Sequence, residues 1–288
     1  MLHIVPMPSQ ATLTEYLKRQ TFVAFDTETT GLWAPTNHVV EIGAVKFSVE
    51  AGELDDFQQL VNPGRPIPDE VIRIHGITDD AVRNAPGIRS VLESFLSFCG
   101  ENSVLVAHNA PFDISFLGCE MERSGIDFTG HRILDSVDIY HRFFPGLESY
   151  SLESLAVLFE IAPSQKHRAL QDAHLVYRLF ANAVERFPMI DSRDDLLRQF
   201  VTYGLKDGPA LSAELPPEYS ELQRVVDENR PVKIYYQGPN QPVTCRIIHV
   251  KNVFQLGTRY YLHAFCEEVR AERTFRLDRV EKYEILAD

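Results

Sequence analysis

The sequence predicts an α/β domain followed by a smaller domain rich in β-strands. Over residues 21–187, short apolar strands alternate with segments whose apolar residues recur at helical spacing. Over residues 219–288, one helical segment precedes about five short strand-like runs, a count typical of a small β-barrel. We therefore expect domains at residues 1–187 and 218–288, joined by a linker at residues 188–217.

The elements of the first domain follow from β-branched runs and helical periodicity. The expected strands cover residues 21–28, 38–47, 57–61, 103–107 and 132–134. The second and third are antiparallel neighbours, because a turn at residues 50–53 separates them. The expected helices begin near Ser9, Pro86, Asn109, Ser151 and His167. One further helix is expected inside the linker, at residues 191–201.

Composition and charge narrow the classes of function. The 288 residues are 44% hydrophobic, enough for a sizeable core, and the net charge of −13 argues against a protein that coats nucleic acid non-specifically. The four cysteines lack metal-ligand spacing, which suits reduced thiols and a cytoplasmic location. The sequence shows no signal peptide and no membrane-spanning run, so we expect no membrane partner.

The first chemical motif places two acids at the end of the first strand. Asp26 and Glu28 are two residues apart, so a strand points both to the same face. Two carboxylates side by side repel each other unless a positive charge lies between them, and a hard divalent cation is the usual partner. The alternative is an ordinary strand end with solvated acids.

The second motif follows the apolar strand that ends at residues 107–108. Asn109 is a good N-cap and Pro111 suits the first helical turn, so Asp113 is expected in that turn. The carboxyl end of a strand is where α/β sheets place groups that face ligands. The alternative is that Asp113 only complements the helix dipole.

The third motif lies at the start of the last long helix of this domain. Asp172 is expected one turn into the helix, and His167 at or just before its start. Four carboxylates, from Asp26, Glu28, Asp113 and Asp172, can hold two Mg²⁺ or Mn²⁺ ions about 4 Å apart, the spacing used for phosphodiester cleavage. Histidine has an ordinary pKa of about 6.5, so His167 can accept a proton from an attacking water.

These three motifs resemble those of the DEDDh 3′→5′ exonucleases, the group that contains epsilon-like proofreading subunits and RNase T. The matching residues are 25–32 (FDTETTGL), 108–113 (HNAPFD) and 167–173 (HRALQDA), and the intervening residues 74–78 (IHGIT) are also similar to the family. The resemblance runs from about Thr21 to Phe187, with the motifs in order and no catalytic position substituted.

The resemblance implies an RNase H-like mixed sheet flanked by helices. It also implies a catalytic set in which Asp26 bridges both metals, the other three acids complete the coordination, and His167 is the general base. Cleavage would release nucleoside 5′-monophosphates from a 3′ end of DNA or RNA. The residues expected to bind substrate are Thr29, Leu32, His108 and Phe112, although core packing is an open alternative for Leu32 and Phe112. Trp33, the sole tryptophan, stacks a base or covers the sheet end.

The second domain differs in charge from the first. Residues 219–288 carry 11 basic and 10 acidic side chains, which leaves 17 basic and 31 acidic residues before them. In the last strands Arg273, Phe275, Leu277 and Arg279 fall on one side of a two-residue repeat, an arrangement that suits a phosphate or nucleotide. The alternative is that the arginines extend to the surface over a small core. The expected contact residues are Arg246, Arg273, Arg276 and Arg279.

This segment resembles the WYL domain, a small Sm/SH3-like barrel. The residues that carry the likeness are 234–236 (IYY), 257–262 (GTRYYL) and 273–279 (RTFRLDR), with Tyr260 in place of the tryptophan that names the domain. The resemblance implies a regulatory ligand, an extra contact with nucleic acid, or a surface for homo-oligomers. It also makes a role in phage defence conceivable.

Taken together, the motifs favour a metal-dependent 3′→5′ exonuclease whose C-terminal domain modulates access of substrate. Two alternatives remain. One is a polymerase-associated proofreading subunit, although the WYL-like domain occupies the place where such subunits carry a polymerase-binding tail. The other is a regulator that senses nucleic acid or a ligand and keeps the nuclease fold as a scaffold.

Overall fold

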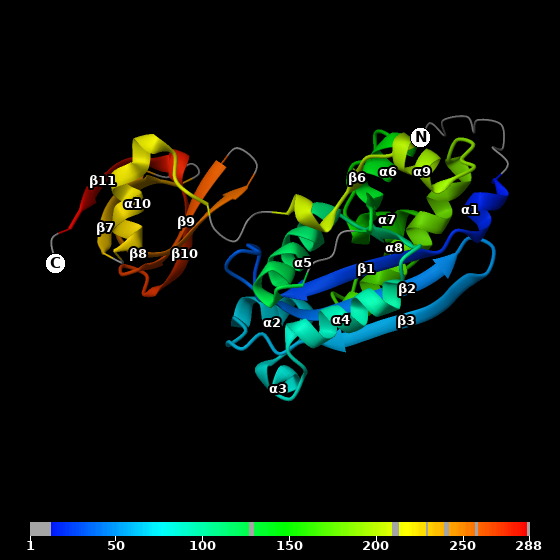
Figure 1. The fold of residues 1–288 in the computed structure, drawn as a ribbon, viewed down its shortest axis with the longest axis horizontal. Helices are drawn as coiled ribbons and strands as arrows, with labels where there is room; N and C mark the ends of the chain where they lie inside the picture. Colours follow the sequence, from blue (N-terminus) through cyan, green and yellow to red (C-terminus); the bar gives the residue numbers. More distant parts are fainter. Residues whose placement is uncertain are drawn as a thin grey trace. The chain divides into compact units, whose positions relative to one another are not determined.

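The computed structural model describes residues 13–126, 130–208, 213–228, 230–238, 242–256 and 259–286. The chain divides into two compact units (Figure 1). The first comprises Met1–Leu32 and Asn37–Gly208, and the second comprises Trp33–Thr36 and Pro209–Asp288.

The first unit is built on a six-stranded mixed sheet with the order β3-β2-β1-β4-β5-β6. β1 pairs antiparallel with β2 and parallel with β4; β5 pairs parallel with β4 and antiparallel with β6. The strands are β1 (Phe22–Thr29), β2 (Val39–Ser48), β3 (Gly52–Leu60), β4 (Val104–Ala107), β5 (Ile133–Asp135) and β6 (Thr202–Tyr203).

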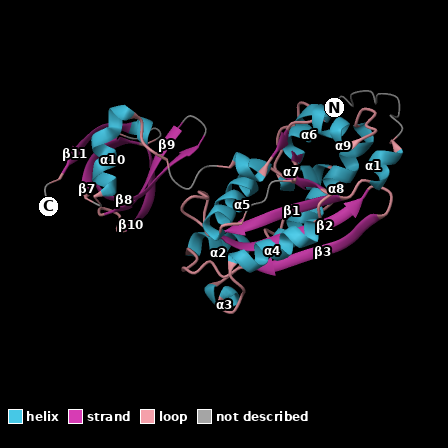
Figure 2. Ribbon diagram, viewed as in Figure 1, coloured by secondary structure: helices cyan, strands magenta, loops and turns pink. Residues whose placement is uncertain are grey.

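Helices cover both faces of this sheet (Figure 2). α8 packs on β1 and β2, and α6 and α7 pack against α8. α4 packs on β2 and β3 and contacts α5. The helices are α1 (Glu15–Arg19), α2 (Asp69–His75), α3 (Asp79–Val82), α4 (Ile88–Cys99), α5 (Ala110–Ser124), α6 (Ser136–Phe143), α7 (Leu152–Leu158), α8 (Ala169–Ala183) and α9 (Arg193–Gln199).

The two faces of β1 are distinguished by its alternating side chains. Phe22 stacks with Phe47 and Phe180 in the core beneath α8, whereas Phe25 lies against Phe95 of α4. Even-numbered residues of β1 therefore point to the α8 face. Asp26 and Glu28 continue this even-numbered series beyond the apolar core.

The predicted mixed α/β architecture is confirmed, with local differences. β3 begins at Gly52, earlier than residue 57, because its first half carries exposed acids that pair at the sheet edge without an apolar pattern. Asn109 occupies the N-cap position of α5 but has φ 61° and makes no side-chain cap, contrary to expectation. The first helix is described only from Glu15, with Thr14 as its cap; Ser9 lies outside the described residues.

The predicted linker is structured over its first part. α9 falls inside the helix expected at residues 191–201, β6 then joins the sheet beside β5, and the first unit extends to Gly208. Ile190, Leu196 and Leu205 are buried, and burial of these few apolar residues is the reason that the segment packs on the first unit.

The second unit holds an antiparallel sheet with the order β10-β9-β8-β7-β11. α10 (Ser220–Asp227) packs on β8 and buries Leu222 and Val225 in the core of this unit. The strands are β7 (Pro231–Gln237), β8 (Val243–Leu256), β9 (Arg259–Cys266), β10 (Ala271–Arg276) and β11 (Val280–Ile285).

The predicted small domain of short antiparallel strands is confirmed. In the described residues β10 and β11 are not paired with each other, so the strand pairing by itself does not establish a closed barrel. One expectation for this unit needs correction. β10 ends at Arg276 and residues Leu277–Arg279 form a 3₁₀ turn. The two-residue repeat therefore does not extend from Arg273 to Arg279, because the turn rotates the last side chains away from the strand register.

In the part of the chain that the structure describes, none of the helices has the length and apolar character needed to cross a bilayer.

The packing of α8 on the sheet predicts a large effect of shortening Phe180. This side chain is fully buried against Phe22, Phe47 and Phe187. We expect Phe180→Ala to lower the free energy of unfolding of the first unit by about 3–5 kcal/mol, measured by urea denaturation. Val157→Ala, which shortens an exposed side chain on α7, is the control and should change stability by less than about 1 kcal/mol.

Candidate metal centre

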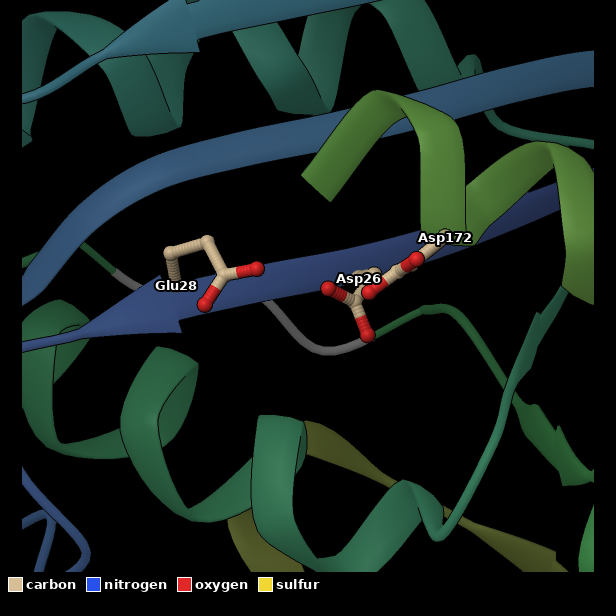
Figure 3. Close-up of side chains that lie close together, drawn as sticks. All are labelled: Asp26, Glu28 and Asp172. Carbon is tan, nitrogen blue, oxygen red and sulfur yellow. The ribbon is translucent and has the colours of Figure 1, made fainter. Parts of the chain in front are cut away.

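Three carboxylates from two elements meet at the end of β1. Asp26 and Glu28 project from β1 and Asp172 from α8, and one oxygen of each lies within 4.8 Å of the others (Figure 3). The alternation of β1 places both strand acids on the α8 face, and Asp172 lies in the first turn of α8. Segments about 140 residues apart in the sequence thus form one acidic cluster.

The fourth predicted acid, Asp113, lies beside this cluster but outside the group of three. It is buried in the first turn of α5, and its Oδ1 accepts hydrogen bonds from the Thr27 N–H at 3.0 Å and the Thr27 hydroxyl at 2.8 Å. Thr27 lies between Asp26 and Glu28, so these bonds tie the start of α5 to the acidic end of β1. After burial, the charge of Asp113 is the largest cause that raises the pKa of Asp26.

Burial and mutual repulsion raise the pKa values of these acids. Burial, followed by the charges of Asp113, Glu28 and Asp172, raises the pKa of Asp26 well above its ordinary value. Burial and the charge of Asp172 raise the pKa of Glu28 to about 8. The pKa of Asp113 rises to about 7 through burial, against the hydrogen bonds from Thr27 that lower it. A site with this much uncompensated negative charge favours a cation.

The two carboxylate oxygens of Asp172 differ in their hydrogen bonds. Its Oδ2 accepts a hydrogen bond from the Gln165 side-chain amide at 2.6 Å, while its buried Oδ1 has no partner within the described residues. Burial raises the pKa of Asp172, and the Gln165 bond and the charge of His167 act in the opposite direction. Carboxylate oxygens are the ligands that Mg²⁺ and Mn²⁺ prefer, so Asp26, Glu28 and Asp172 together are suited to hold such an ion.

His167 lies next to this cluster on an exposed loop. It precedes α8 by two residues, has φ 49°, and its side chain is exposed. A positive φ is uncommon for a residue with a side chain and often marks a functional turn. Burial raises the pKa of Asp172 and the charge of His167 acts against this rise, while the role of His167 as a base stays a prediction.

The predicted substrate residues occupy different environments. Leu32 is 74% exposed, whereas Thr29 is buried and its hydroxyl donates to the Gly31 carbonyl at 2.7 Å. Phe112 is half-buried against Phe116.

His108 is held inside the first unit. Its Nδ1 lies 2.8 Å from the Ser136 hydroxyl and its Nε2 lies 2.9 Å from the Tyr150 carbonyl. Burial lowers its pKa to about 4. These bonds join the end of β4 to α6 and to residue 150, which is a structural role. Contact of His108 with substrate stays a prediction.

An ion pair that the sequence did not predict lies beside the acidic cluster. Glu41 of β2 is fully buried, and Arg168, between His167 and α8, binds it through Nη2 at 2.6 Å and Nε at 3.0 Å. The available signal was a lone acid in the otherwise apolar run of residues 39–45, because a charge in a strand buried on both faces needs a partner.

Three of the four predicted contact arginines, Arg246, Arg276 and Arg279, have acidic side chains as neighbours. Arg276 forms a two-bond contact with Asp278, at 3.0 and 2.6 Å, and this contact together with the charges of Arg259 and Arg279 lowers the pKa of Asp278. The charge of Arg246 acts on Glu268 in the same direction. Arg273 is exposed. Binding of phosphate by these four arginines stays a prediction.

Trp33 groups with the second unit. Its ring centroid lies 5.2 Å from that of Tyr261 and 6.3 Å from that of Phe254.

Comparison with known families identifies both units. The family model described as an exonuclease matches residues 23–180, more than half of the chain. The WYL domain model matches residues 217–285.

Curated relatives resemble the first unit. DNA polymerase III subunit epsilon of Treponema pallidum is 39% identical over 165 residues, a match that covers 57% of this chain and 76% of that protein. DNA polymerase III PolC-type of Halalkalibacterium halodurans is 38% identical over 170 residues. That match covers 57% of this chain but only 12% of the PolC-type protein, so the chain corresponds to a small part of that polymerase.

Solved structures share the fold of the first unit. The nuclease domain of 3′hExo, described as a DEDDh family member bound to rAMP, has a TM-score of 0.53 and 18% identity, and the match covers 59% of this chain and 94% of that domain. A 3′-exonuclease described in recognition of a histone mRNA stem-loop has a TM-score of 0.51 and 18% identity, with 58% of this chain and 82% of that chain covered.

The raised pKa values predict how the stability of the metal-free protein changes with pH. Glu28 and Asp113 bind their protons more tightly in the folded state than in the unfolded chain, where carboxyl pKa values are about 4. Between about pH 6.5 and pH 8, only the folded state still releases these protons, so its stability falls as the pH rises. Thermal unfolding in EDTA should therefore occur at a lower temperature at pH 8 than at pH 6.5.

Mg²⁺ should reduce this fall, because a bound cation neutralises the acids. Glu28→Gln should also reduce it in EDTA, since the variant lacks one titrating group. A metal-free wild-type protein whose melting temperature is constant or rises over this pH range would contradict the prediction.

Proposed function

This chain belongs to the exonuclease family of the DEDDh type and carries a WYL domain after its nuclease unit, and from this premise we propose that it removes nucleotides from the 3′ end of nucleic acid by hydrolysis. The observation that carries the proposal is the acidic group of Asp26, Glu28 and Asp172, with Asp113 beside it and His167 at its edge. Each of these residues comes from a motif that the sequence matches in order.

We assign the four acids to two Mg²⁺ or Mn²⁺ ions. Asp26, Glu28 and Asp172 would hold these ions together with Asp113, which lies beside the group of three. When bound, such ions supply charge stabilisation for the phosphodiester and lower the pKa of a bound water. The buried acids keep their positions through bonds inside the protein, Asp113 to Thr27 and Asp172 to Gln165.

His167 is the proposed general base. Its exposed position before α8 lets the ring approach a water near Asp172 without breaking a helical hydrogen bond. Leu32, Thr29 and Phe112 are the proposed contacts for the terminal nucleotide, together with His108. Leu32 suits this role best, because a large apolar side chain that is 74% exposed offers a surface to a base.

The names of the relatives favour DNA as substrate. The match to DNA polymerase III subunit epsilon covers most of that protein, whereas the structural neighbours described with rAMP or a histone mRNA show the fold alone. Because these relatives are polymerase subunits, a polymerase-associated proofreading role is the second candidate. The WYL domain at residues 217–285 favours a free-standing nuclease in our proposal.

The intact set of acids weighs against a regulator without catalytic activity. We propose that the WYL domain modulates access of substrate, through a ligand or a contact with nucleic acid. Homo-oligomer formation and a role in phage defence stay predictions.

Removal of one cluster acid tests the proposed reaction. We expect Asp172→Asn and Asp26→Ala to reduce release of 5′-mononucleotides below detection, because the site then holds the cations poorly, and EDTA should do the same to the wild type. The assay compares 3′-labelled and 5′-labelled single- and double-stranded DNA and RNA oligomers with and without Mg²⁺. Asp194→Asn, at an exposed position on α9, is the control and should retain full activity. Undiminished activity in EDTA or in Asp172→Asn would exclude the proposal.

Substitution of His167 tests the general base separately. His167→Ala should lower kcat by about 100-fold or more, the contribution expected of a positioned base, and leave Mn²⁺ binding unchanged. The matched control is His174→Ala on α8, the helix that follows His167; the His174 ring contacts the Leu170 carbonyl and Glu53. A His167→Ala enzyme with a normal kcat at pH 7 would show that the residue does not activate the water.

A further inference from the structure

We propose that Glu41 is a positioning residue: it fixes the start of α8 on β2 and thereby sets where Asp172 and His167 lie relative to the acids of β1. The inference rests on the proposed function, since it concerns the same site. Glu41 lies directly opposite Glu28 in the pairing of β1 with β2.

The hydrogen bonds of Glu41 define its role. Oε2 accepts from the Ala169 backbone N–H at 3.0 Å and from Arg168 Nε at 3.0 Å. Oε1 accepts from Arg168 Nη2 at 2.6 Å and from the Gln58 side-chain amide at 2.8 Å. A carboxylate has about four lone-pair sites, and four donors occupy those of Glu41. Glu41 is therefore occupied as an acceptor and is not a further ligand for a cation, although it lies next to the cluster.

Two of these donors belong to the segment that carries the catalytic groups. Arg168 directly follows His167, and the Ala169 N–H is the first of α8. A helix N-terminus leaves its first N–H groups without partners, so a buried carboxylate there stabilises the start of the helix. Asp172 follows Ala169 by three residues, about one turn, so its position depends on where Ala169 is held.

Gly43 makes this contact sterically possible. It lies two residues after Glu41 on the same face of β2 and pairs with Asp26. A Cβ at Gly43 would lie 2.0 Å from Leu170 N and 2.1 Å from the Ala169 carbonyl carbon, so the backbone of α8 rests directly on this glycine. Glu41 and Gly43 thus form a seat for α8, opposite the two residues of β1 that bear the acids.

The cost of burying Glu41 supports a positioning role. A buried carboxylate is costly unless it is paired and fully hydrogen-bonded, and breaking such a pair is strongly destabilising. Arg168, by contrast, is partly exposed and lines an open pocket of about 470 Å³ that Gln58, Asn84 and Pro86 also line. The pocket gives small solutes access to the Arg168 side of the pair.

Glu41→Gln tests the inference, because it preserves shape but replaces two acceptor sites with donors. Removal of groups that orient metal ligands typically weakens metal binding or activity by about 10–100-fold. We expect a loss of this size in Mn²⁺ affinity, measured by calorimetry without nucleic acid, together with a similar fall in kcat and a KM for oligonucleotide within about threefold of wild type. Amide hydrogen exchange at residues 169–172 should become faster.

Glu120→Gln is the matched control for a merely structural effect. Glu120 is an equally buried acid on α5, bonded to His38, the Val39 N–H and Arg123, and it is not part of the acidic cluster. It should lower stability without changing Mn²⁺ affinity. Equal Mn²⁺ affinities for Glu41→Gln and wild type, or equal losses in both variants, would overturn the inference. The Mn²⁺ and exchange measurements remain decisive even if the wild-type protein cleaves no oligonucleotide, which would refute only the proposed function.

Chemical rescue tests the Arg168 side of the pair. Arg168→Ala should weaken Mn²⁺ binding, and millimolar guanidinium entering through the pocket should restore it in this variant but not in Glu41→Gln. Wild-type Mn²⁺ affinity in Arg168→Ala without guanidinium, or a loss of Mn²⁺ affinity that guanidinium does not restore, would show that the bond from Arg168 to Glu41 does not help to position the start of α8.

Discussion

Repulsion among buried carboxylates is the constraint on which the first unit depends. Asp26, Glu28 and Asp172 bring oxygens within 4.8 Å of one another, and burial removes the water that would screen them. Such a group is unfavourable in the absence of a cation, so the surrounding fold has to hold it in place. Burial first, and then the charge of Asp172, raises the pKa of Glu28 to about 8.

The fold holds the acids through contacts between distant segments. Thr27 fixes Asp113 from the strand side, and the Glu41–Arg168 pair fixes the start of α8 from the neighbouring strand. Below these polar contacts, Phe22, Phe47 and Phe180 form an apolar core that keeps α8 on the sheet. The apolar core therefore stabilises the fold enough to keep the acids close together, and the polar hydrogen bonds set their positions.

The second unit differs from the first in its core and in the environment of its charged residues. Its antiparallel sheet buries a modest core under α10, and its arginines have acidic neighbours rather than a shared unpaired surface. Charge balance of this kind suits a module that acts by binding something selectively more than one that attracts nucleic acid by net charge.

The sequence by itself determined the order of the main elements and the presence of two units, and it singled out the four acids and His167 as candidate site residues. It could do so because strand alternation, helical spacing and motif order are local properties. Only the tertiary structure decided that Asp113 lies beside the group of three, that β3 starts at Gly52, and that residues 188–208 pack on the first unit. It also revealed the seat formed by Glu41 and Gly43, since a glycine pressed against a helix and a buried acid bonded 127 residues away depend on contacts that no local pattern encodes.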